Sequence, residues 1–177
     1  MRVATAQKSN PARTEQIILF RASNQIFAIS SSAVQEVRSV DSLAGAAVEF
    51  NEPSLGKVRH AIHRGERNLY VVNAAIHFGL HPTPAALIFL LRKSRVALLV
   101  DGIEKMTTMS RLQALPGAFC HEECVWYRGL TVLDQNVIPV VNPMGFLTAE
   151  EFALLDRVAD PQNVPEVAGT AEAGLPL

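Results

Sequence analysis

The sequence has almost no cysteine, and its only two cysteines, Cys120 and Cys124, lie close together in the chain. This does not suit the disulfide framework of a small extracellular domain. Long apolar runs are also missing, since the longest, AALIFLL at residues 85–91, is far too short to span a bilayer. The first residues, MRVATAQKSNPAR, are polar and lack the apolar segment of a secretory signal. These absences predict a cytoplasmic protein without direct membrane insertion.

An excess of charge of either sign is absent as well. The chain has 16 lysine and arginine residues and 17 acidic residues, which leaves a net charge of -1. No global basic surface of the kind that binds nucleic acid follows from this balance, and we expect no nucleic-acid partner. Hydrophobic residues make up 49% of the 177 residues and charged residues 19%, as is typical of a globular domain. A chain of this size needs no metal or disulfide to stabilise its core.

The familiar catalytic signatures are missing too: the sequence has no GxSxG elbow, no GxxxxGK[ST] phosphate loop and no GxGxxG motif. His77 and His81 have the spacing of zinc ligands on a helix, but Phe78 follows the first histidine where a zinc protease requires glutamate. We therefore interpret both as surface histidines. The CHEEC segment at 120–124 lacks a second ligand pair, which favours free thiols on an exposed loop over a metal site. We predict no enzyme activity, no cofactor and no metal.

Asp101 is the most prominent single candidate for chemistry, because it follows the apolar run 96–100 and precedes Gly102. A phosphate-accepting aspartate of this kind lies at the end of a central parallel strand in a sheet flanked by helices. The strand–helix alternation of such a sheet is missing here, and Asp-Gly favours a turn, so we interpret Asp101 as a turn residue. The alternative is a small enzyme in which Asp101, His121 and Cys124 lie within hydrogen-bond distance of one another.

Most of the patterned segments are typical of β-strands. The expected strands comprise residues 16–22, 25–30, 34–40, 69–73, 86–91, 95–100 and 137–142. Short polar turns between the first two and between 86–91 and 95–100 predict two hairpins. Pro139 predicts an edge position for the last strand, because proline cannot donate a backbone hydrogen bond. A short helix is expected after residue 73, ending near Gly79.

One amphipathic helix is expected near the end of the patterned region. Thr148 is a good N-cap, and Glu151 three residues later completes a capping box. Phe152, Leu155 and Val158 are expected to share the buried face of this helix. Strands that occur in runs, without long helices between them, exclude a doubly wound α/β sheet and favour small, partly closed antiparallel barrels.

Three further segments have weaker patterns. Residues 1–14 are expected to form a flexible lead-in, residues 15–158 a single ordered domain, and residues 159–177 a disordered tail. The basic stretch RHAIHRGER at 59–67 carries only three arginines in a neutral protein. We interpret it as a solvated loop or a protein-contact patch rather than a nucleic-acid site.

Several of these segments, taken in order, resemble a known family. They are IILFRASNQIFAISSSAVQEVRSV, the Arg-Gly pair before LYVVN, then VALLVDGIEKM, LQALP, VIPVVN and LTAEEFALLDRV. Over residues 15–158 the chain is similar to the CheW-like chemotaxis coupling proteins. The resemblance implies a mainly β fold of two small SH3-like five-stranded barrels that share a hydrophobic interface, with a short C-terminal helix.

The same resemblance implies a non-enzymatic adaptor that couples chemoreceptors to a CheA-type histidine kinase in chemotaxis or motility signal transduction. The expected partners are the regulatory domain of that kinase and the cytoplasmic tip of methyl-accepting chemoreceptors, with recruitment to membrane receptor arrays. A CheW-like binding module in a non-chemotaxis kinase pathway is the alternative. Matched residue by residue, the expected protein-binding positions are Val34, Glu36, Arg38, Arg64, Gly65, Asp101 and Gly102.

Side-chain chemistry agrees with a contact role at these positions. Glu36 and Arg38 share one face of a predicted strand and can offer opposite charges at the rim of an interface. Arg64 beside a glycine can extend a guanidinium from a tight turn to a carboxylate, in a bidentate contact that lysine cannot copy. The Asp101-Gly102 pair would bend a strand and present its edge.

The chain also departs from the family pattern in its first half. Arg59 and His60 stand where the family usually carries Gly-Val, and Tyr70 and Asn73 stand where it carries Pro and Asp. The Pro-rich approach to this region is reduced to the pair at 52–53. The hypothesis is therefore a divergent coupling protein that serves a specialised receptor–kinase system, such as one for gliding or pilus motility.

Overall fold

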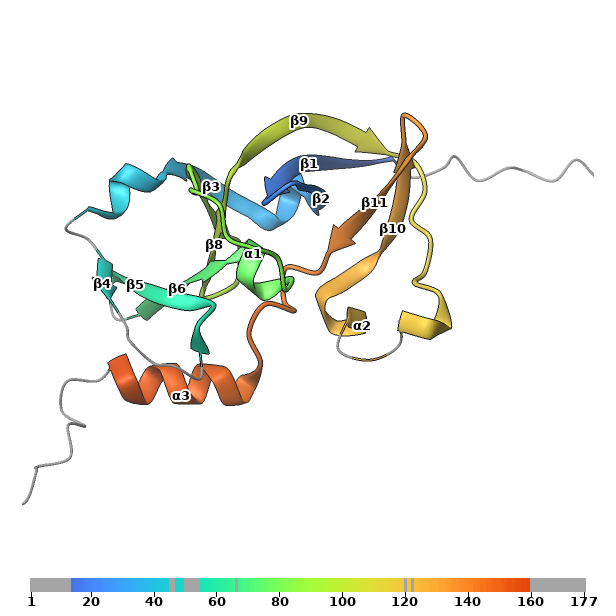
Figure 1. Ribbon diagram of the computed structural model, residues 1–177. Helices are drawn as coiled ribbons and strands as arrows, with labels where there is room; N and C mark the ends of the chain where they lie inside the picture. The colour runs from blue at the N-terminus through green and yellow to red at the C-terminus, as the bar shows by residue number, and fades with distance from the viewer. Residues whose placement is uncertain are drawn as a thin grey trace, which may run out of the picture.

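The computed structural model describes residues 14–44, 47–49, 55–65, 67–119, 121 and 123–159. The predicted lead-in and tail lie outside the described residues, apart from Thr14 and Ala159. Two β-sheets stand next to each other, β9 arches across the top, and one longer helix, α3, lies below the sheet on the left (Figure 1). The predicted mainly β fold, with two small sheets that share a hydrophobic core and a short C-terminal helix, is confirmed.

The first sheet has five strands in the order β10-β11-β2-β1-β9. Its strands are β1 (Glu15–Ala22), β2 (Gln25–Ser30), β9 (Gly102–Met109), β10 (Tyr127–Leu133) and β11 (Asn136–Val141). Neighbouring strands are antiparallel except β11 and β2, which meet in parallel at the single pair Val140 and Ala28.

The second sheet has six strands in the order β3-β7-β8-β6-β5-β4. Its strands are β3 (Val34–Ser39), β4 (Ala47–Glu49), β5 (Val58–Arg64), β6 (Arg67–Asn73), β7 (Leu87–Leu91) and β8 (Val96–Val100). The sixth strand, β4, has only three residues and was not expected. This sheet is one continuous stretch of chain inserted between β2 and β9, so the five-stranded sheet is assembled from two separate stretches.

Short helical elements connect the strands. They are η1 (Ser31–Ala33), η2 (Val40–Leu43), α1 (Ala74–His77), η4 (Gly117–Phe119), α2 (Glu123–Trp126) and α3 (Ala149–Ala159). The short helix predicted before Gly79 is α1, and the predicted capping box begins α3. The Thr148 N–H donates to the Glu151 carboxylate at 2.8 Å, and the Glu151 N–H donates to Thr148 Oγ1 at 3.1 Å.

The buried face of α3 differs from the predicted one at a single residue. Leu155 is fully buried and Phe152 packs against the core, but Val158 is 44% exposed. Leu154 and Ala159 pack against the core where Val158 does not.

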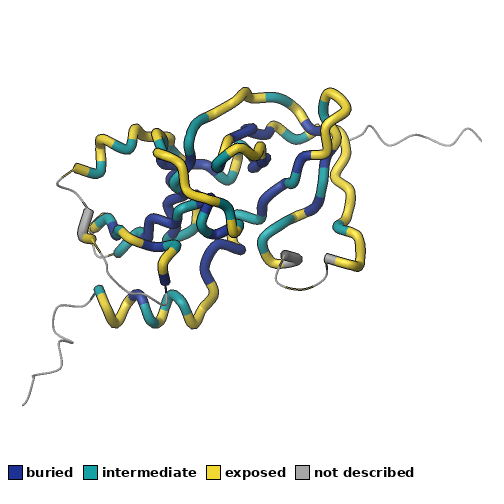
Figure 2. The backbone as a smooth tube through the Cα atoms, in the orientation of Figure 1, coloured by how far each residue is buried: buried dark blue, intermediate teal, exposed yellow. Residues whose placement is uncertain are grey.

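The core explains why so many strands are apolar along their whole length. Ile18 and Phe20 of β1 point into a cluster between the two sheets, whereas Ile17 and Leu19 point into a second cluster within the five-stranded sheet. In the same way β6, β7 and β8 bury alternate residues between the sheets and within the six-stranded sheet. Much of the dark blue in Figure 2, which marks buried residues, lies along these strands. Burial on both faces produces continuous apolar runs rather than alternation.

Two strand predictions were wrong. Pro139 does not lie at a sheet edge, because β11 stands between β10 and β2. Pairing with β2 is limited to Val140, so the missing N–H of Pro139 interrupts no ladder on that side. The basic stretch 59–67 is no loop, since β5 runs to Arg64 and β6 begins at Arg67. A register shift between Val58 and His60 breaks the alternation that would have revealed β5.

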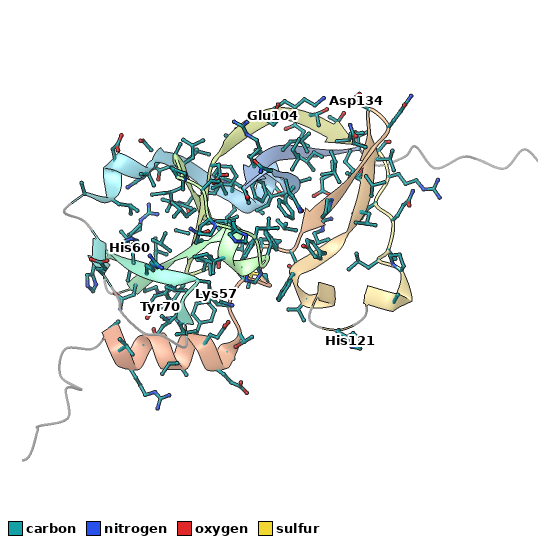
Figure 3. The ribbon with its side chains drawn as sticks, in the orientation of Figure 1. Lys57, His60, Tyr70, Glu104, His121 and Asp134 are labelled. Carbon is teal, nitrogen blue, oxygen red and sulfur yellow. The ribbon has the colours of Figure 1, made fainter. Side chains whose placement is uncertain are left out.

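A polar cluster fixes α3 against the six-stranded sheet. The hydroxyl of the fully buried Tyr70 donates to Asp156, and Arg95 donates to both oxygens of the same carboxylate at 2.7 and 3.0 Å. Figure 3 places Tyr70 between the sheet and α3. The Arg95 guanidinium also lies 4.7 Å from the centre of the Phe152 ring, and Lys57 pairs with Glu151 at 2.7 Å. Two of the departures from the family pattern are structural here, since Tyr70 belongs to this cluster and Asn73 caps α1.

The turn between β10 and β11 predicts a stabilising substitution. Asp134 and Gln135 connect the paired residues Leu133 and Asn136, with φ angles of 49° and 66°, as in a type I′ turn. A left-handed conformation costs a non-glycine residue about 1 kcal/mol. Gln135→Gly should therefore raise the free energy of unfolding by about 1 kcal/mol, measured by urea denaturation.

The matched control for this turn is Asn136→Gly, one residue further on. It should lower stability by roughly 0.5–1 kcal/mol, because Asn136 lies inside β11, where glycine gains nothing from its conformational freedom. Equal stability of Gln135→Gly and the unchanged protein would contradict the account of the turn.

Candidate functional site

The predicted contact positions on β3 separate into one buried residue and one exposed ion pair. Val34 is 8% exposed and belongs to the core between the sheets. A register shift between Val34 and Glu36 lets the following side chains turn outward. Arg38 donates to both oxygens of Glu36, Nε at 2.8 Å and Nη2 at 3.0 Å, so the two share one face as predicted. β3 stands at the edge of its sheet and presents this pair to solvent.

Arg64 and Gly65 form the end of the β5–β6 hairpin. Gly65 has φ +63°, and a Cβ there would meet nothing within 4 Å, so glycine serves the turn and not a tight contact. Arg64 is exposed and close enough to β3 to act on Glu36. The pKa of Glu36 is lowered, first by the hydrogen bonds from Arg38 and also by the Arg64 charge. The structure therefore brings Glu36, Arg38 and Arg64 together on one surface.

A groove of about 530 Å³ opens beside this surface, and we call it the cationic groove. It is lined by Gln35, Arg64, Arg67, Leu69, Leu90, Leu91, Lys93, Ser94 and Arg95. Four of these nine residues are basic, and none is acidic. Arg67 belongs to the basic stretch 59–67 described in the sequence analysis. Lys93 and Arg95 were not predicted, because nothing in the sequence indicates that the β7–β8 turn lies next to the β5–β6 hairpin.

Asp101 and Gly102 lie elsewhere, at the junction of β8 and β9. The Asp101 N–H donates to the Arg21 carbonyl at 2.9 Å, and the Asp101 carboxylate accepts from the Thr83 hydroxyl. The chain bends at Asp101, which confirms the interpretation as a turn residue. A Cβ at Gly102 would meet the Arg21 guanidinium at an ordinary 3.6 Å. Among the described residues, no hydrogen bond or ion pair links this junction to Glu36, Arg38 or Arg64.

The candidate metal and catalytic groups do not form a site in the part of the chain that the structure describes. No group of three or more His, Cys, Asp or Glu side chains there could hold a metal ion. Cys120 and the Cys124 side chain lie outside the described residues, and His121 is exposed. The hypothetical enzyme with Asp101, His121 and Cys124 therefore gains no support.

His77 corrects one interpretation from the sequence. His81 is exposed as predicted, but His77 is only 6% exposed. The ring lies about 5 Å from the rings of Trp126, Phe78 and Phe146, at centroid distances of 4.8, 5.0 and 5.1 Å. Its Nε2 atom is buried without a hydrogen-bond partner among the described residues. Burial, and secondarily the Lys57 charge, lowers the pKa of His77 to about 3.

Comparison with known proteins assigns the chain. A family model described as the CheW-like domain matches residues 16–151, which is most of the sequence. The chain belongs to the CheW-like family. No curated protein matches the sequence well enough to count as a relative.

A solved structure agrees with this family at the level of the fold. The crystal structure of the scaffolding protein TtCheW from Thermoanaerobacter tengcongensis superposes with a TM-score of 0.60 at 13% sequence identity. The match covers 73% of this chain and 90% of that one. Among the described residues, no helix is long and apolar enough to cross a membrane.

The buried histidine of this CheW-like protein predicts a loss of stability in acid. In the unfolded chain His77 binds a proton below about pH 6.5, but in the folded protein it remains neutral until about pH 3. Protonation therefore favours unfolding as the pH falls between these values. From pH 7 to pH 4 the His77 contribution should fall by about 3 kcal/mol.

Urea denaturation of the unchanged protein and of His77→Leu at each pH isolates this contribution. As the pH falls from 7 to 4, the unfolding free energy of the variant should rise by about 3 kcal/mol relative to that of the unchanged protein. His81→Leu is the control at an exposed position and should leave the difference constant. Parallel pH profiles of the unfolding free energy for the unchanged protein and His77→Leu would contradict this account, because the pKa of His77 would then be the same in the folded and the unfolded chain.

Proposed function

We propose that this protein is a non-enzymatic adaptor that couples chemoreceptors to a CheA-type histidine kinase. Its partners in this proposal are the regulatory domain of the kinase and the cytoplasmic tip of the receptors, which would recruit it to receptor arrays. Membership of the CheW-like family is the observation that carries the proposal. The scaffolding role printed for the structurally similar TtCheW agrees with it.

The surface formed by Glu36, Arg38 and Arg64 is the proposed kinase contact. Both oxygens of the Glu36 carboxylate already accept hydrogen bonds from Arg38, so the pair is neutral overall and held in place at the rim of the proposed interface. Arg64 has no ion pair among the described residues and keeps its planar guanidinium for a carboxylate of the partner. Val34 and Gly65 act indirectly, since one fixes β3 on the core and the other forms the turn behind Arg64.

The Asp101-Gly102 junction is the proposed second contact. It begins β9, an edge strand of the five-stranded sheet, and its hydrogen bonds to Arg21 and Thr83 hold the bend in place. An edge strand offers backbone N–H and C=O groups to a partner. Two contact regions on two different sheets suit a protein that must hold two partners.

The mechanism is thermodynamic. An adaptor that binds receptor and kinase together converts their encounter into an intramolecular event and raises their effective concentration. Receptor state then biases the kinase through contacts that differ between its signalling states. A CheW-like module in a non-chemotaxis kinase pathway would use the same surfaces, and the departures at Arg59 and His60 favour a specialised partner in either case.

The test is a calorimetric titration of the purified protein with the regulatory domain of the CheA-type kinase from the same organism. Reversible micromolar binding is expected. Arg64→Glu should weaken it by about tenfold or more, because it replaces an attractive charge with a repulsive one. Arg111→Glu is the matched control: it is exposed and follows β9 of the five-stranded sheet, whereas Arg64 lies in the six-stranded sheet.

The outcomes separate the function from the site. Binding that both variants leave intact would keep the adaptor function and move the kinase contact away from Arg64. Failure of the kinase domain and of a receptor-tip peptide to bind would contradict the adaptor function itself.

A further inference from the structure

The cationic groove gathers positive charge. Arg64, Arg67 and Lys93 are exposed on its lining, and none of the three forms an ion pair among the described residues. Arg95, the fourth basic side chain of the lining, pairs with Asp156. Three cations that no described acid pairs with, around one groove, are a strong local field in a protein whose net charge is -1.

The groove is not only basic, because leucines also line it. Leu90 and Leu91 are almost fully buried, at 4% and 3% exposed, so the accessible apolar side chain is the partly buried Leu69. Gln35 from the edge strand β3 and Ser94 from the β7–β8 turn add polar groups to the lining. The lining therefore fits an extended segment that carries carboxylates and aliphatic side chains together, and it fits a small inorganic anion less well.

The molecule already shows what kind of group this lining accepts. The Asp156 carboxylate of α3 receives both donors of Arg95, a residue of the lining, at 2.7 and 3.0 Å. The first cause of the lowered pKa of Asp156 is this bidentate hydrogen bonding. One cation of the lining is thus already paired with an acid of the chain itself.

Backbone geometry fixes the positions of two of these cations. Gly65, next to Arg64, has φ +63°, and Lys93 itself has φ +55°. A left-handed conformation costs a lysine about 1 kcal/mol relative to glycine, which is the usual residue there. Both residues lie in hairpin turns, so the turns fix where the two cations emerge from the sheet.

We infer that the cationic groove binds an acidic peptide segment of the partner protein, with carboxylates on Arg64, Arg67 and Lys93 and an aliphatic side chain against Leu69. The identity of that partner rests on the proposed function, whereas the acidic chemistry rests on the groove. The inference adds Arg67 and Lys93 to the contact residues matched from the family, and it makes them determinants of which partner is chosen.

The probe is a fluorescein-labelled peptide of ten alternating glutamate and leucine residues, and its counterpart with glutamine in place of glutamate is the control peptide. Fluorescence anisotropy on the full chain should show binding of the glutamate peptide and none of the glutamine peptide. The affinity should fall by about tenfold or more when salt is raised from about 0.05 to 0.5 M, because exposed charges are screened. Each of Arg67→Gln and Lys93→Gln should weaken binding by about fivefold.

Arg111→Gln, at an exposed position outside the groove lining, is the matched control variant and should bind the peptide like the unchanged protein. Urea denaturation of all three variants verifies that each is folded. Peptide binding that is insensitive to Arg67→Gln and Lys93→Gln would overturn the inference, and so would equal binding of the glutamate and glutamine peptides.

The same assay separates this inference from the proposed function. Kinase binding that depends on Arg64, without any binding of the glutamate peptide, would keep the adaptor function and overturn the acidic groove. Peptide binding without kinase or receptor binding would support the groove and contradict the function. Residues 160–177 contain three acids and no lysine or arginine. If the peptide binds only after their removal, the groove belongs to the chain's own C-terminal segment, and the inference for a partner is overturned.

Discussion

The apolar layer between the two sheets is the constraint on which the rest of this CheW-like protein depends. Strands β1, β6, β7 and β8 bury alternate residues on both faces, toward the shared layer and toward the interior of their own sheet. A strand buried on both faces has no surface left for recognition. The proposed partner contacts lie instead on the edge strand β3, at the end of the β5–β6 hairpin and at the bend before the edge strand β9.

The polar cluster on α3 complements this apolar layer. Tyr70 is fully buried, and desolvation together with its hydrogen bond to Asp156 raises its pKa to about 12. Asp156 has a lowered pKa, chiefly through the hydrogen bonds from Arg95. Near neutral pH the tyrosine is therefore neutral and the aspartate ionised, so small changes around neutral pH leave the attachment of α3 unchanged. Arg95 belongs to this cluster and to the lining of the cationic groove, so the position of the groove depends on the position of α3.

Much of this architecture could be predicted from the sequence. Strands buried on both faces give apolar runs, and the capping box of Thr148 and Glu151 is a local signal, so both were found. The errors arose where long-range pairing decides. β5 was not predicted because a register shift interrupts its alternation. β9 has little apolar pattern because only its last residue, Met109, is buried. Pro139 is tolerated inside a sheet because β11 pairs with β2 at only one position, Val140. The burial of His77 and the shared groove of Lys93 and Arg64 depend on which surfaces meet in the folded chain. No local sequence pattern predicts those contacts.

The order in which the elements leave the ribosome has a consequence for biosynthesis. The six-stranded sheet is complete by Val100, but the helix that covers Tyr70 and neutralises Arg95 is made only at residues 149–159. Until then the nascent chain carries an uncovered aromatic side chain and an unpaired arginine on an otherwise finished sheet. Folding can therefore be completed only after the last helix has been translated. Products that stop before α3 would expose this face to chaperones and proteases, which gives the cell a means to remove incomplete copies before they reach a partner.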